Sequence, residues 1–169
     1  MKLDEAKEQF ISSWGTLGSS WGVSKTMAQI HALLMISPKP LNAEEIMEAL
    51  NISRGNTNMN VRALMDWGLV EKIHKLGERK EFFEAEKELW LIASRIASER
   101  RKRELEPIVR ILNNLEEVQD PKADQKELKQ FTGQMKELKQ FTGKVDKIFN
   151  KLTAANEKWF TGVLMKIIR

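Results

Sequence analysis

The fold of this protein is decided by residues 53–90, SRGNTNMNVRALMDWGLVEKIHKLGERKEFFEAEKELW. Early in this stretch, apolar side chains recur at helical spacing while amides and guanidinium groups occupy other positions, which predicts an amphipathic helix. Gly68 is typical of the residue just past the C-terminus of a helix. Two runs of alternating apolar and polar residues follow, Leu69–His74 and part of Glu81–Ala85, and the charged segment Lys75–Lys80 separates them. We therefore predict a helix followed by a β-hairpin.

Three more helices are expected before this one. Residues 3–21 and 25–36 carry apolar side chains at steps of three and four, so each has one apolar side. Asn42, followed three residues later by Glu45, has the pattern of a capping box at the start of a short third helix. Ser53 can cap the fourth helix. Four helices followed by a hairpin is the order of a winged helix-turn-helix, so we expect a mainly α fold with a small β-hairpin wing.

The second half of the chain also has the pattern of helices. A long helix is expected from Leu89, and Pro107 marks a kink or a restart within it, because proline has no amide hydrogen to donate. Asp120 and Pro121 predict the next break. A last long helix is expected from about Ala123 to the end of the chain.

That last helix contains the sequence KELKQFTG twice, at Lys126–Gly133 and at Lys136–Gly143. We interpret this as a tandem duplication, which lengthens a helix by about 15 Å. Apolar positions still step by three and four across it, so the helix keeps a face for packing. An apolar cluster near the end, together with the first helix, is the expected dimer seam; it contains Trp159, Phe160, Val163, Leu164, Ile167 and Ile168.

These elements predict three parts of the chain. Residues 1–22 are expected to form an N-terminal dimerisation helix, and residues 23–88 a winged helix-turn-helix domain that binds DNA. Residues 89–169 are expected to form a C-terminal helical dimerisation region.

Charge and composition limit the classes of partner and site that this chain can have. The formal net charge is +4, and the excess of Lys and Arg begins at Ser53. The chain has no cysteine, which excludes disulfides, thiolate nucleophiles and Cys-ligated zinc. No run of eighteen apolar residues is present, and the first ten residues mix charges of both signs. We therefore expect a cytoplasmic protein without a membrane partner.

The run from Ser53 to Arg62 has the chemistry needed to read DNA. Asparagine can pair with adenine and arginine with guanine through two hydrogen bonds in the major groove. Asparagine and threonine are weak helix formers, so their concentration here favours a functional face over the alternative of a solvated helix surface with caps. Lys75, Arg79 and Lys80 in the predicted turn could contact phosphates or the minor groove, although such a turn alone more often serves solubility.

The same residues resemble the DNA-binding core of GbsR-type regulators, a branch of the MarR-like winged-helix proteins. The resemblance is strongest over residues 43–90 and depends on three features in order: the Ser-x-Gly-Asn start, the Trp-Gly-Leu-Val junction and the Gly-Glu-Arg-Lys-Glu wing. It is looser over the earlier segment FISSWGTLGSSWG, and it fades beyond Arg110. Such proteins are homodimers that bind operator DNA, often as repressors, and some relatives control glycine betaine or choline metabolism.

The resemblance implies which residues face DNA. On the helix these are Ser53, Arg54, Asn56, Thr57, Asn58 and Asn60, and on the wing they are Arg79 and Lys80. With Arg62 and Lys75, which the residue pattern adds, they form the predicted DNA-binding site.

Other functions have little support in the sequence. His31 and His74 do not have the spacing of zinc ligands, and His31 is more typical of a packing residue. Catalytic motifs are not apparent, so neither an enzyme nor a cofactor is expected. Core packing is the favoured role for the five tryptophans, at positions 14, 21, 67, 90 and 159, over an aromatic cage for a quaternary ammonium effector.

We therefore expect a dimeric, sequence-specific transcriptional regulator, more often a repressor, that binds a pseudo-palindromic operator and can respond to a small molecule. Two alternatives remain open. One is a winged-helix module that binds another protein and not DNA, and the other is a small-molecule sensor whose output is a partner protein.

Overall fold

The computed structural model of the chain describes residues 1–20 and 22–154, with side chains as far as Lys151. It is mainly helical with one small antiparallel sheet, which confirms the expected winged-helix fold class. The chain divides into two compact units, from Met1 to Ile92 and from Ala93 onward. The expected seam residues between positions 159 and 168 lie outside the described residues, and the three-part domain division stays a prediction.

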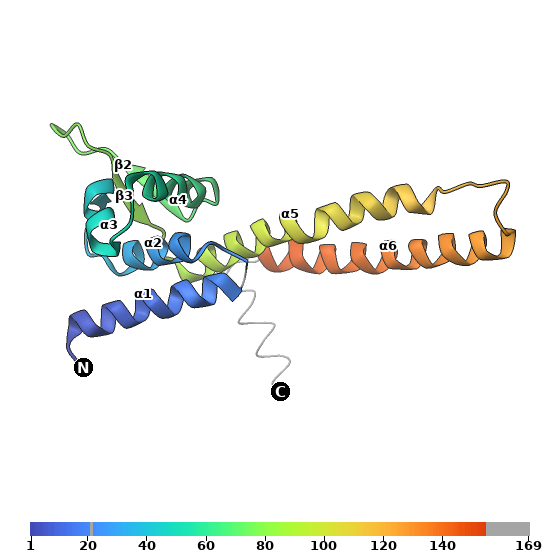
Figure 1. The fold of residues 1–169 in the computed structure, drawn as a ribbon, viewed down its shortest axis with the longest axis horizontal. Helices are drawn as coiled ribbons and strands as arrows, with labels where there is room; N and C mark the ends of the chain where they lie inside the picture. The colour runs from blue at the N-terminus through green and yellow to red at the C-terminus, as the bar shows by residue number, and fades with distance from the viewer. Residues whose placement is uncertain (21, 155–169) are drawn as a thin grey trace. The chain divides into compact units, whose positions relative to one another are not determined.

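Four helices build the first unit: α1 (Leu3–Ser20), α2 (Lys25–Ile36), α3 (Ala43–Leu50) and α4 (Arg54–Asp66). Figure 1 shows α1 running alongside α2, with α3 and α4 next to α2. Each of the four helices coincides with one that the apolar spacing predicts. α1 lies in the same compact unit as the winged helix.

The predicted helix ends are present as hydrogen bonds. The Asn42 Oδ1 accepts from the amides of Glu44 and Glu45 at 2.9 and 3.1 Å, and the Glu45 Oε2 accepts from the Asn42 amide at 2.8 Å. This reciprocal pair is the capping box of α3. The Ser53 Oγ accepts from the Asn56 amide at 3.3 Å at the start of α4. Gly68, with φ of +70°, closes α4, since glycine adopts the left-handed conformation without a steric penalty.

The sheet has three strands in the order β1-β3-β2: β1 (Leu41–Asn42), β2 (Val70–Ile73) and β3 (Phe82–Ala85). β2 and β3 form the expected hairpin, which begins with Val70 opposite Ala85 and ends with Ile73 opposite Phe82. β1 was not predicted, because two residues are too few to show a strand periodicity. Its pairing with β3 joins the start of α3 to the base of the wing.

The core of this unit holds α4 in a fixed rotation. Ile30 and Leu34 of α2, Ile46 of α3, and Thr57 and Leu64 of α4 are its largest fully buried side chains. Because the buried side of α4 is fixed against α2 and α3, the opposite side of the helix is directed to solvent.

Two long helices build the rest of the described chain: α5 (Leu89–Glu116) and α6 (Gln125–Ala154). They run side by side in opposite directions (Figure 1). Arg101 of α5 donates to both carboxylate oxygens of Asp146 of α6 at 2.5 and 3.1 Å. Pro107 lies inside α5, so of the two expected outcomes, a kink or a restart of the helix, the restart is wrong and the kink stays a prediction. In the described part of the chain, no helix has both the length and the apolar character required to span a membrane.

Candidate nucleic-acid interface

One side of α4 presents a continuous polar surface. At about 100° per residue, the exposed residues of this helix fall within an arc of about 140°. Arg54, Asn58 and Arg62 follow one another at steps of four along this arc, and Met59 lies at its edge. The arc therefore combines hydrogen-bonding groups for base edges with an apolar side chain of the kind that contacts a thymine methyl group.

Two predicted DNA contacts lie on the opposite side of α4. Thr57 is 0% exposed, and its Oγ1 donates to the Ser53 carbonyl oxygen at 3.1 Å. Asn60 is 3% exposed, and its Nδ2 donates to the carbonyl oxygen and the Oδ1 of Asn56 at 2.8 and 2.7 Å. The prediction that these two side chains face DNA is therefore corrected: they stabilise the first turns of α4 from inside.

Ser53 and Asn56 belong neither to the exposed arc of α4 nor to its fully buried side. Ser53 is exposed at the start of the helix, where its Oγ caps the Asn56 amide. Asn56 is half-buried and holds Asn60 through its Oδ1. Both residues have structural roles here, and a DNA contact by either of them stays a prediction.

The predicted basic residues of the wing lie in different surroundings. Arg79 is exposed and makes no hydrogen bond or ion pair with the described part of the chain. The Lys75 Nζ lies 3.6 Å from the centre of the Phe82 ring, a cation–π contact that anchors the turn to β3. Lys72 pairs with Glu81 across the hairpin at 2.6 Å.

Lys80 forms an ion pair with Glu44 in the first turn of α3, and the same carboxylate lies 3.6 Å from the Arg54 guanidinium. The hydrogen bond from Lys80 and its positive charge lower the pKa of Glu44, and the same bond raises the pKa of Lys80. Glu44 thus connects α4 to the wing through one carboxylate. Sequence reasoning missed it, because the pairing depends on α3 and the wing coming together in space.

A hollow of about 190 Å³ lies between these elements. Its lining includes Glu44, Arg54, Asn58 and Lys80, so the base of the polar arc and the base of the wing share one concave surface. A phosphate or a base edge that entered it would meet two cations, Arg54 and Lys80, and the amides of Asn42 and Asn58, with the carboxylates of Glu44 and Glu81 competing for the cations.

Comparisons with known proteins agree with this geometry. Residues 21–79 match the model of the MarR family. The candidate HTH-type transcriptional regulator YvaV of Bacillus subtilis (strain 168) is 22% identical over 132 residues, which cover 73% of this chain and 75% of YvaV. The HTH-type transcriptional repressor OpcR of the same organism is 23% identical over 88 residues, 52% of this chain and 48% of OpcR.

A solved structure described as the crystal structure of a transcriptional regulator shares the fold. Its TM-score is 0.65 at 17% sequence identity, and the match covers 88% of this chain and 95% of that one. The protein is a DNA-binding transcriptional regulator with a winged-helix fold, and its residues 21–79 are similar to the MarR family. Its function is regulation and not catalysis.

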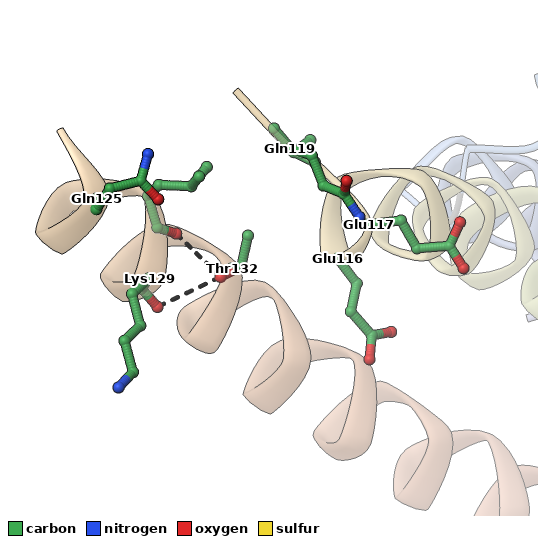
Figure 2. Close-up of a pocket in the computed structure, with 8 residues that line it drawn as sticks. Glu116, Glu117, Gln119, Gln125, Lys129 and Thr132 are labelled. Atoms are coloured by element: carbon green, nitrogen blue, oxygen red, sulfur yellow. Dashed lines mark hydrogen bonds between the residues drawn. The ribbon is translucent and has the colours of Figure 1, made fainter. Parts of the chain in front are cut away.

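A second hollow of the regulator, of about 430 Å³, lies where the residues between α5 and α6 meet the two helix ends (Figure 2). Glu116 and Glu117 point away from each other there, and the Thr132 Oγ1 donates to the carbonyl oxygens of Leu128 and Lys129. Carboxylates that do not converge do not form an acid–base pair. In the described residues no group of three or more potential ligands could hold a metal ion.

Aromatic residues of the regulator pack between α1 and α2. The Trp14 ring centre lies 5.6 Å from that of Phe10 and 6.3 Å from that of His31. This fits the expected packing role of Trp14 and His31. Trp21 and Trp159 lie outside the described residues, so the less favoured alternative, an aromatic cage for a quaternary ammonium effector, is not tested for them.

Proposed function

We propose that the regulator is a repressor of the GbsR-type branch that binds a pseudo-palindromic operator as a homodimer. The observation that carries this proposal is the exposed arc of α4, which holds Arg54, Asn58 and Arg62, and whose Arg54 and Asn58 line one hollow with Lys80 of the wing. OpcR, one of the similar proteins, is named a repressor, which supports that direction of regulation. Because its target is chromosomal DNA, we place the regulator in the cytoplasm.

In this proposal the helix and the wing have different tasks. Arg54 and Asn58 contact base edges in the major groove, where guanidinium and amide groups distinguish base pairs. Arg62 lies two turns after Arg54 on the same side of α4 and makes a further contact with the DNA. Arg79 and Lys80 contact phosphates, which strengthens binding with little dependence on sequence.

The proposal is tested by binding of the full chain to labelled genomic fragments at several salt concentrations. Arg54→Ala and Asn58→Ala are expected to lower the preference for the operator over random DNA by about 10-fold or more each, as for the loss of a base contact. Arg79→Ala is expected to weaken binding to both kinds of DNA equally and to reduce the salt dependence by about one ion. Arg110→Ala is the matched control, because Arg110 is an exposed arginine on α5.

The result that contradicts the proposed interface is unchanged binding by a variant that lacks Arg54, Asn58 and Arg79 together. Repression is tested separately, with a reporter gene placed behind the selected operator. Loss of the regulator is expected to raise expression, and lowered expression would make the protein an activator.

A further inference from the structure

α6 carries two apolar surfaces, of which α5 covers one. Thr142 is buried at 8% exposure on the side of α6 from which Asp146 pairs with α5. Large side chains on the neighbouring side of α6 remain exposed: Phe131 at 41%, Leu138 at 40%, Phe141 at 65% and Ile148 at 58%. Their number and size exceed what scattered surface residues explain.

α5 contributes to the same face. Leu112 of α5 is buried. Ile108 lies four residues before it and is 50% exposed, and Ile111 lies one residue before it and is 56% exposed. Leu138 and Phe141 occupy the same two places relative to the buried Thr142. In an antiparallel helix pair, residues that lie at the same angle from the line of contact on each helix are found on the same side of the pair. These residues therefore form one apolar surface, the hairpin face, which comprises Ile108, Ile111, Phe131, Leu138, Phe141 and Ile148.

The duplication in the sequence explains how this face arises. Ten residues turn a helix by about 80° less than three full turns, so the two copies of KELKQFTG present the same residues in different directions. Leu128 of the first copy is half-buried, whereas Leu138 of the second is exposed on the hairpin face. The second copy thus adds two large apolar side chains, Leu138 and Phe141, where the first adds only Phe131.

The spacing of the face along α6 has a two-fold symmetry. Phe131, Leu138, Phe141 and Ile148 follow one another at seven, three and seven residues, which is symmetric about a point between Lys139 and Gln140. Spacings of three and seven are those of the core positions of a coiled coil. An antiparallel second copy would place Phe131 against Ile148 of the partner subunit and Leu138 against Phe141 of the partner subunit. A two-fold interface requires this kind of self-complementary surface.

The charges beside the face agree with the same register. Glu137 and Lys144 lie on the edge of α6 away from α5, and neither forms an ion pair within the described chain. They are also nearly symmetric about the same point, so an antiparallel copy would bring Glu137 close to Lys144 of the partner subunit. A parallel copy would bring neither charge opposite its counterpart.

We propose that the hairpin face is a dimerisation surface, in which α6 pairs antiparallel with α6 of a second copy of this chain around an axis near Leu138 and Phe141. The proposal rests on the homodimer of the proposed function and gives it a location. It differs from the seam expected from the sequence, which combined the first helix with residues 159–168. Burial of the exposed Phe, Leu and Ile side chains is the driving force.

The test is the mass of the full chain in solution at micromolar concentration, by sedimentation equilibrium. The wild type is expected at twice the chain mass of 19.5 kDa. The variant Leu138→Glu/Phe141→Glu, which brings four carboxylates to the axis, is expected at 19.5 kDa with unchanged helical circular dichroism. Gln140→Glu is the control, because it adds one carboxylate per chain on a side of α6 outside the hairpin face and should leave the dimer intact.

A charge exchange tests the register without disturbing the apolar residues. Glu137→Lys and Lys144→Glu are each expected to raise the dissociation constant of the dimer by about 3-fold or more, and the double variant is expected to restore it. If the wild type and Leu138→Glu/Phe141→Glu are both dimeric, this interface is wrong, whereas the proposed homodimer is still supported. A wild type that is monomeric overturns both, although binding of single half-sites by α4 would still support the DNA interface.

Discussion

Lys80 of the wing and Glu44 of α3 are joined by an ion pair across 36 residues of sequence. Arg54, a predicted base contact, shares the same carboxylate at 3.6 Å. Two cations of the proposed DNA interface are therefore already partly neutralised in the DNA-free protein. Binding of DNA at this position must exchange the carboxylate for phosphate or base acceptors.

We predict that Glu44→Gln binds DNA more tightly than the wild type. Removal of one negative charge beside two cations is expected to raise affinity for random DNA by about 3- to 10-fold at low salt and to steepen its fall with salt. The measurement is fluorescence anisotropy with a labelled random duplex at a series of salt concentrations. Lower affinity would show that Glu44 serves mainly to position the wing.

Glu48→Gln is the matched control for this prediction. Glu48 is an exposed carboxylate on the same helix, and it has no ion pair within the described chain. The two variants have the same net charge, so an effect common to both would reflect the overall charge of the protein and not the contact between Glu44 and the cations.

Thr57→Val separates the two sides of α4. The buried Thr57 hydroxyl donates to the Ser53 carbonyl oxygen, so its loss is expected to lower the free energy of unfolding by about 1 kcal/mol. Operator preference should remain unchanged, because the side chain does not reach the surface. Urea unfolding and competition binding measure the two quantities, and a loss of preference without a loss of stability would return Thr57 to the DNA interface.

The contrast between Thr57 and Asn58 shows what sequence reasoning can resolve. The polar run identified α4, its Ser53 cap and its Gly68 end, because each of these depends on neighbouring residues. It did not place Thr57 and Asn60 on the buried side of the helix, since they have the same chemistry as residues that read DNA. Only the packing of α4 against α2 and α3 makes that distinction.

Features that depend on contacts between distant parts of the chain could not be predicted from the sequence either. β1 has two residues and exists because β3 pairs with it, and the Glu44 cluster exists because the wing folds back toward α3. Pro107 was expected to kink or restart its helix, and the structure shows a helix that is continuous through this residue. A proline is tolerated inside a helix when the surrounding turns and packing outweigh one lost hydrogen bond, and a sequence does not display that balance.

Gly18→Ala is predicted to destabilise the packing of α1 against α2. Gly18 is buried, and a methyl group there would overlap the Ala28 side chain. We expect a loss of about 1–3 kcal/mol in the free energy of unfolding, which exceeds the gain in helix propensity of about 1 kcal/mol. Gly133→Ala on α6 has open space around it and is expected to stabilise the protein slightly. A higher melting temperature for Gly18→Ala would contradict the close helix contact.

His31 is predicted to make the stability of the regulator depend on pH. It is 2% exposed on α2, and its Nε2 has no hydrogen-bond partner among the described residues. Burial lowers the pKa of this imidazole from 6.5 to about 4. The unfolded chain therefore binds a proton near pH 6.5 while the folded chain does not.

The sign of the effect follows from this difference in proton binding. The stabilisation is fully present above pH 6.5 and is lost as the pH falls toward 4, by about 3 kcal/mol over that window. Urea unfolding between pH 7 and pH 4 measures the slope, and His31→Leu is expected to flatten it. His74→Leu is the control, since His74 is exposed at the end of the hairpin and its loss should leave the slope unchanged. Parallel curves for the wild type and His31→Leu would show that the folded and unfolded chains bind protons equally at His31, which contradicts the lowering of its pKa by burial.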